Sequence, residues 1–171
     1  MRYLLVWGLG VSLWGCTLLE RRAEPIEFAG TWEGEVEVTT QKPDGTKETA
    51  KKQIKLSIMP NPLDEEKEKG KEERPLLVFY NDLPMPANIR GRRFHVEEET
   101  KERFAMIIGF LGLLAKGDVE LTDFKMEGKL RSAGEMKYEL LMKFRVGEKK
   151  GSIEQEGVLR RTSERFSIPL Q

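Results

Sequence analysis

Apolar and polar residues alternate along much of this chain, and this period of two constrains the fold more than any other feature. From Trp32 onward, one side of the alternation carries Trp32, Gly34, Val36 and Val38, and the other side carries glutamates. Successive side chains of a β-strand point to opposite faces of the sheet. The pattern therefore predicts a strand with one buried and one solvated face.

The alternation recurs in several later segments. A Pro-Asp-Gly turn at residues 43–45 leads into a segment in which Ile54, Leu56 and Ile58 share a face, which predicts a hairpin. Further strands are predicted at residues 76–80, 89–96, 119–121, 124–130, 138–146 and 153–159, with a break at Pro84 and Pro86. About eight strands joined mostly by short turns predict an all-β fold, an antiparallel meander that closes into a barrel or a curled sandwich.

Two segments interrupt the alternation. Residues 64–74 hold six acidic and four basic side chains and no apolar one, which predicts a solvated excursion. Residues 104–115 are uncharged and carry large apolar residues at helical spacing, which predicts one short helix near residues 100–116. Gly109 and Gly112 weaken a helix by roughly 1 kcal/mol each relative to alanine, so a strand pair stays open as the alternative. Such a helix would cover an open end of the barrel or dip into a bilayer.

The charges of the chain balance, with 29 basic and 29 acidic side chains. A nucleic-acid-binding face calls for a clear excess of basic residues, so we expect no nucleic-acid partner. The chain has one cysteine, Cys16, and so cannot form an intramolecular disulfide.

Cys16 ends a hydrophobic leader. Arg2 precedes an uncharged stretch of 11 residues, 4–14, and the small residue Gly15 stands before the cysteine. A membrane-spanning helix needs roughly 17–25 apolar residues, so this stretch is too short to remain as one.

This leader resembles the type II signal peptide of bacterial lipoproteins, with a lipobox that ends at Cys16. The resemblance implies a cleaved signal peptide at 1–15, acyl chains such as palmitate on Cys16, a lipidated tether at 16–28 and a β-barrel-like domain at 29–171. One acyl chain holds a protein only marginally, and two or more anchor it stably. Thr17 replaces the aspartate that retains such lipoproteins at the inner membrane. We therefore expect a lipid-anchored protein of the cell envelope, at the outer membrane where the source has one.

Patterns of catalytic and metal-binding residues are missing from the sequence. His95 is the chain's single histidine, which excludes a multi-histidine metal site, and the arginines at 90, 92 and 93 are interpreted as a charged strand face. Carboxylate pairs such as Glu154 and Glu156 are too frequent to indicate a site. The chain contains no phosphate-binding glycine loop and no CxxC, HExxH or GxSxG motif. We predict no enzymatic activity, no metal and no cofactor.

Three short motifs resemble lipocalins. Gly30, Thr31 and Trp32 resemble the Gly-X-Trp opening of that family, in which the tryptophan closes the base of an eight-stranded barrel. Residues 122–124, Thr-Asp-Phe, are similar to the family's Thr-Asp-Tyr turn, and Arg160 or Arg161 stands for the arginine that packs over the tryptophan. The resemblance implies a lipocalin-like barrel, although lipocalins place their helix after the last strand and not in mid-chain.

These observations leave two hypotheses for function. In the first, a lipid-anchored, non-catalytic envelope domain serves as an interaction or structural module that contacts another envelope protein. In the alternative, the domain is a lipocalin-like carrier whose interior holds a small hydrophobic ligand, lined by Trp32, Val36, Ile54, Leu56, Tyr138, Leu140 and Phe144.

The two hypotheses differ in the barrel interior. Barrels of about eight strands are either filled by side chains or hold one small ligand. An apolar cavity of roughly 300 Å³ or more inside the barrel favours the carrier. A filled interior with an exposed apolar patch favours the interaction module. Two inward carboxylates in a cleft would instead indicate a hydrolase.

Overall fold

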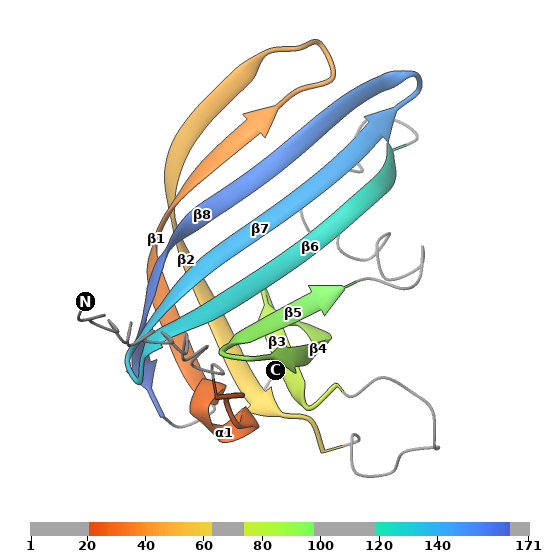
Figure 1. Cartoon of the computed structure of the whole chain (residues 1–171). Coiled ribbons are helices and arrows are strands. Elements are labelled where there is room, and N and C mark those ends of the chain that lie inside the picture. Colours follow the sequence, from red (N-terminus) through yellow and green to blue (C-terminus); the bar gives the residue numbers. More distant parts are fainter. Residues whose placement is uncertain (1–20, 63–73, 98–118, 165–171) are drawn as a thin grey trace, which may run out of the picture.

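Within residues 21–62, 74–97 and 119–164, which the computed structural model of the chain describes, eight antiparallel strands follow one another around a closed barrel (Figure 1). A short helix, α1 (Pro25–Phe28), precedes them. The strands are β1 (Gly30–Gln41), β2 (Lys47–Pro60), β3 (Leu76–Tyr80), β4 (Leu83–Arg90), β5 (Arg93–Glu97), β6 (Val119–Ser132), β7 (Glu135–Val146) and β8 (Lys149–Ser163). Each strand pairs with the next, and β8 pairs with β1. The predicted all-β meander is confirmed, as a barrel and not as a sandwich.

The β1–β2 hairpin follows from the sequence pattern. Its register runs without interruption from Gly30 opposite Ile58 to Gln41 opposite Lys47. In the turn, Gly45 adopts a φ of +88°, which glycine reaches at little steric cost. The Thr46 backbone N–H donates to the Asp44 carboxylate at 2.8 Å, and this hydrogen bond lowers the pKa of Asp44.

The strands differ strongly in length. β1, β2, β6, β7 and β8 have 12 to 15 residues each, whereas β3 and β5 have 5 and β4 has 8. β3 pairs with β2 only between Leu56 and Pro60, and β5 pairs with β6 only between Lys125 and Lys129. The long strands therefore extend past the short ones toward one end of the barrel, as Figure 1 shows. We call this end, with the turns at 42–46, 81–82 and 147–148, the open end.

The opposite end, which we call the closed end, is covered by α1. The Phe28 side chain is fully buried, and its ring meets the ring of Phe94 edge-on at 5.9 Å between centroids. The Ala23 backbone N–H donates to the Gly91 carbonyl at 2.7 Å, which fixes the chain before the helix to the β4–β5 turn. Glu24 and Glu27 form a reciprocal capping box at the start of α1.

The tether predicted for residues 16–28 is therefore wrong for Ala23 and for α1. The segment has few hydrophobic residues, but Ala23 and Phe28 are both buried against the barrel. The ordered domain begins earlier than the predicted boundary at residue 29.

The predicted strand count is correct, but two of the predicted strands were divided wrongly. Residues 89–96 are not one strand, because a turn with Gly91 at a φ of +59° separates β4 from β5. Pro84 and Pro86 do not break the chain but lie within β4, opposite Phe79 and Leu77 of β3. Proline has no N–H to donate, so it is tolerated in a strand at positions where no neighbouring strand needs that hydrogen bond. The described pairing of β4 with β5 begins only at Asn88, beyond both prolines.

Residues 119–121 and 124–130 belong to one strand, β6. A register shift between Leu121 and Asp123 places a bulge at Thr122, so residues 122–124 do not form the lipocalin-like turn predicted for them. A bulge inserts one unpaired residue into a continuing strand, and this explains why the alternation slips there.

Several predictions fall outside the described residues. These are the leader with Cys16, most of the charged excursion at 64–74, and the helix near residues 100–116. In the part of the chain that the structure describes, no helix is long and apolar enough to cross a bilayer.

Candidate ligand-binding site

Trp32 closes the barrel interior at the closed end. Its indole N–H donates to the Phe28 carbonyl at 2.8 Å, so the tryptophan holds α1 in place. On the other side, the guanidinium carbon of Arg161 lies 4.6 Å from the centre of the Trp32 ring, and this guanidinium also donates to the Glu27 carbonyl. Of the two arginines predicted for this position, Arg161 takes it.

The interior next to Trp32 is densely filled. Phe94, Gly128, Tyr138, Gly157 and Val36 lie opposite one another in register across β5, β6, β7, β8 and β1. A Cβ added at Gly128 would come within 2.2 Å of the Phe94 ring and 2.6 Å of the Met136 sulfur. Glycine is thus required here because an aromatic ring already fills the space above it.

A neutral polar cluster lies above this filled part. The Tyr138 hydroxyl donates to Gln155 Oε1 at 3.3 Å. The Tyr80 hydroxyl donates to the same oxygen at 3.3 Å and accepts from Gln155 Nε2 at 3.1 Å. Gln155 is 8% exposed and Tyr138 is fully buried. Burial raises the pKa of both tyrosines, so the cluster carries no charge at neutral pH.

An open cavity of about 690 Å³ lies next to this cluster. Its inward-facing lining combines apolar and polar side chains from β1, β2, β3 and β8: Val38, Thr40, Ile54, Tyr80, Ile153 and Gln155. The rest of the lining is Glu33 of β1, Lys52, Gln53 and Lys55 of β2, and Asn81 in the β3–β4 turn. The cavity thus extends to the part of β2 that reaches past its pairing with β3, where the short strands leave the wall lower.

The charges around the cavity do not cancel. Glu33 is its carboxylate and lies 3.7 Å from the Lys55 ammonium, so these two form an ion pair. Lys52 stands opposite Val36 in the β1–β2 register and so belongs to the inner face of the sheet. The described residues of the lining therefore carry one net positive charge, on Lys52.

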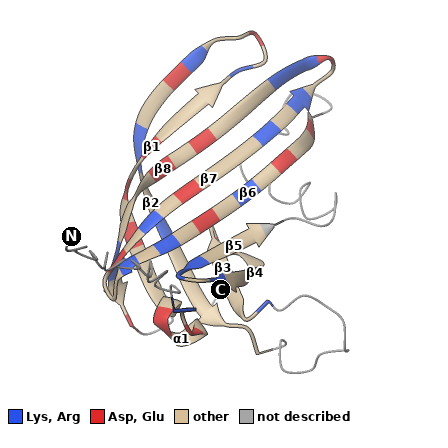
Figure 2. Cartoon of the chain, in the orientation of Figure 1, with Lys and Arg blue, Asp and Glu red and all other residues tan. Residues whose placement is uncertain are grey.

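The outer face of the barrel carries a row of glutamates. Glu37, Glu156, Glu139 and Glu127 lie directly opposite one another on β1, β8, β7 and β6, and His95 on β5 ends the row. Figure 2 shows how acidic and basic residues are interspersed along these long strands. Like charges directly opposite one another destabilise a sheet unless cations lie between them.

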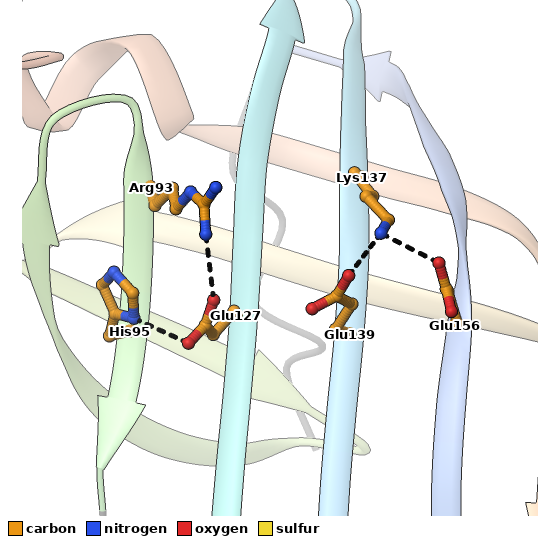
Figure 3. Close-up of polar contacts among 6 residues, drawn as sticks. All are labelled: Arg93, His95, Glu127, Lys137, Glu139 and Glu156. Atoms are coloured by element: carbon orange, nitrogen blue, oxygen red, sulfur yellow. Dashed lines mark ion pairs between the residues drawn. The ribbon is translucent and has the colours of Figure 1, made fainter. Parts of the chain in front are cut away.

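Lysine, arginine and histidine side chains lie beside this row (Figure 3). The Lys137 ammonium contacts Glu139 and lies 2.9 Å from Glu156, and these hydrogen bonds raise the pKa of Lys137. His95 Nδ1 lies 3.1 Å from Glu127. The groove of about 480 Å³ along this face is lined mainly by charged side chains, among them Glu154 and Glu156. This face is a network of surface ion pairs. Of the three arginines interpreted as a charged strand face, Arg93 joins it at 3.7 Å from Glu127, whereas Arg92 lies in the turn between β4 and β5.

The seven residues predicted to line a ligand site are divided by the structure. Ile54 lines the cavity. Trp32, Leu56 and Tyr138 are fully buried in the filled part of the barrel, and Val36 is 1% exposed. Leu140 and Phe144 are buried as well.

Sequence reasoning missed Val38, Lys52, Tyr80, Ile153 and Gln155. Four of these stand in the inward register of β1, β2 and β8, in step with predicted core residues such as Val36 and Ile54. That register was the available signal. For Lys52 and Gln155 this signal was overlooked because their side chains are polar.

Other kinds of site find less support in the described structure. No group of three or more His, Cys, Asp or Glu side chains within it is arranged to hold a metal ion. Ile26, at 64% exposure, is the one large apolar side chain that is exposed on the described surface. A single such side chain does not make an apolar patch. Comparison with models of protein families, with curated protein sequences and with solved structures gave no match.

Proposed function

We propose that this protein is a non-catalytic carrier that binds one small, largely apolar molecule in the open half of its barrel. The cavity of about 690 Å³ is the observation that carries the proposal. Small-molecule sites are typically concave spaces of roughly 300–1,000 Å³, lined by apolar side chains with a few fixed polar groups. Val38, Ile54 and Ile153 supply the apolar lining here, and Gln155 with Tyr80 supplies the polar groups.

The division of the interior supports binding over a purely structural role. A barrel whose only task is to be stable gains by filling its interior, because each cavity loses packing contacts. On the side of β1, β2 and β3, the packed interior gives way to the cavity at Tyr80 and Gln155, whose hydrogen bonds with each other, and that of Gln155 with Tyr138, form a floor that is already in place before a ligand enters. A preformed site reduces the entropy lost on binding.

We further propose that acyl chains on Cys16 hold this carrier at the cell envelope, at the outer membrane where one exists. The support is the leader sequence, in which Arg2, the short apolar stretch and Gly15 precede the cysteine. Replacing Cys16 by serine and fractionating the cells tests this part. The wild-type protein is expected in the membrane fraction with bound fatty acid, and the serine variant is expected to lack the fatty acid. A wild-type protein without fatty acid would overturn the anchoring.

Native mass spectrometry of the full-length protein, released from detergent micelles after extraction from its host, tests the carrier proposal. We expect an added mass of one small molecule on the wild-type protein. Ile153→Trp places a larger side chain in the cavity and is expected to remove this mass. Glu154→Trp is the matched control, because Glu154 is the next residue of β8, is exposed and lines the outer groove. A wild-type protein without bound molecule, or equal binding by both variants, would contradict the proposal.

A further inference from the structure

We infer that the molecule bound in the cavity is a single-chain amphiphile with an anionic head group, and that Lys52 binds this head group at the mouth. This inference rests on the proposed carrier function and adds to it the chemical class and the orientation of the ligand. It follows from the charges around the cavity, from the neutral floor and from the place of Lys52 in the sheet.

The floor of the cavity cannot hold a charged head group. Tyr138, Gln155 and Tyr80 already satisfy one another through hydrogen bonds, and burial keeps both phenols neutral. An ionised group placed there would lose its hydration without gaining a partner of opposite charge, which is strongly unfavourable. A charged ligand therefore enters with its apolar chain toward the floor.

The mouth of the cavity supplies the missing opposite charge. Lys52 is exposed and lies on the same strand and the same inner face as Ile54, which lines the cavity. Neighbouring lysines of β2 are already paired: Lys51 with Glu35 at 2.8 Å and Lys55 with Glu33 at 3.7 Å. Among the described acidic side chains, none forms an ion pair with Lys52.

An ammonium that has no acidic partner among the described residues, placed beside an apolar cavity, selects for anions. A carboxylate or phosphate at this position is attracted to Lys52, remains hydrated on its outer side and leaves its alkyl chain against Val38, Ile54 and Ile153. A neutral amphiphile of the same length gains the apolar contacts alone. The lining thus discriminates by head-group charge, and its selectivity depends on one lysine.

Titration of the full-length protein with defined probes, read by native mass spectrometry from detergent micelles, tests this inference. The probes are hexadecanoate, a lysophosphatidate with the same chain, and hexadecanol. The micelles take up a given probe equally in every sample, so the ratio of apparent Kd values between variants reports on the protein. Lys52→Gln is expected to weaken binding of both anions about tenfold, as an exposed ion pair at contact distance suggests, and to leave hexadecanol within about twofold.

Lys47→Gln is the matched control. Lys47 is an exposed lysine of the same strand, opposite Gln41, and lies on the outer face. Lys47→Gln removes the same charge as Lys52→Gln and is expected to leave the Kd values of all three probes unchanged. The anion that binds the wild-type protein more tightly identifies the source of the head group, a free fatty acid or a phosphate lipid.

The outcomes separate this inference from the carrier proposal. Equal binding of hexadecanol and the anions, unchanged in Lys52→Gln, overturns the role of Lys52 and leaves the carrier intact. Equal weakening by Lys47→Gln and Lys52→Gln also overturns it, because a general charge effect then suffices. Failure of all three probes to bind overturns the inferred ligand class, whereas the carrier itself is overturned only if the wild-type protein extracted from its host also carries no added mass.

Discussion

Replacing Gly128 by alanine tests how densely the barrel is filled beneath the cavity. An ideal Cβ at this position lies 2.2 Å from Phe94 Cε1 and 2.6 Å from Met136 Sδ, both far inside van der Waals contact. Met136 is flexible at its sulfur, but the Phe94 ring is fully buried and is itself fixed edge-on by Phe28. The ring therefore has to move for the methyl group to fit.

The magnitude follows from two opposing effects. Glycine-to-alanine changes at unstrained positions stabilise a protein by about 0.4–1 kcal/mol, because they restrict the unfolded chain. Overpacking of a filled core costs about 1–3 kcal/mol. We expect Gly128→Ala to lower the free energy of unfolding by about 1–2 kcal/mol, and to lower the urea midpoint by about 0.5–1 M at an m-value near 2 kcal/mol/M.

Urea unfolding of the full-length protein, followed by circular dichroism, measures this effect. Gly134→Ala is the control, because a Cβ there meets nothing within 4 Å, and its midpoint should stay the same or rise. Combining Gly128→Ala with Phe94→Leu should cost less than the sum of the two single changes, since the smaller side chain removes the clash. An unchanged midpoint for Gly128→Ala, or strict additivity with Phe94→Leu, would refute the reasoning.

Three further predictions concern the closed end, the floor and the outer face. Arg161→Ala should lower the free energy of unfolding by about 1–3 kcal/mol, because it removes the cation over Trp32 and a hydrogen bond to α1. The exposed Arg160 is the control: in the same urea titration, Arg160→Ala should change the free energy of unfolding by less than about 0.5 kcal/mol. Burial raises the pKa of Tyr138, so its contribution to stability is complete below pH 10 and is lost as the pH rises from there toward the folded-state pKa. Tyr138→Phe should therefore flatten the fall in the free energy of unfolding above pH 10 by up to about 1.4 kcal/mol per pH unit. An identical fall in the variant and the wild-type protein would contradict this. Lys137→Gln should lower the thermal midpoint slightly at low salt and not at 1 M salt, because its partners Glu139 and Glu156 are exposed and salt screens their charges. A shift of the midpoint that is independent of salt would argue against an electrostatic role.

The alternation of the sequence predicts the fold well because the barrel has one dry face. Ile54, Leu56 and Ile58 all point inward, and the β1–β2 register follows from the turn at 43–45. The pattern fails where backbone geometry departs from a regular strand. Thr122 and Asp123 are adjacent polar residues, which read as a gap, whereas the structure accommodates them in a bulge of β6.

The candidate site was less predictable, for a different reason. Its existence depends on the difference in length between β2 and β3, and periodicity does not report where two strands stop pairing. Gln155 and Lys52 were also passed over, because an inward register position is usually apolar. Polar residues that stay in step with a buried stripe, as Gln155 does between Ile153 and Leu159, are the ones that mark a site.

The hydrogen bond from the Ala23 N–H to the Gly91 carbonyl fixes the end of the barrel at which the N-terminal segment leaves it. It holds the start of the described chain at the closed end, opposite the end that contains the cavity. If acyl chains on Cys16 anchor the protein, as we propose, the bilayer would lie within about 18 Å of Arg21, the full stretch of the intervening backbone. A tilted strand of β1's 12 residues is about 30 Å tall, so in such an anchored protein the mouth, at the other end of the barrel, would face away from that bilayer into water. Cargo would then arrive through solution or from an apposed membrane, and not by lateral diffusion within the leaflet that holds the protein.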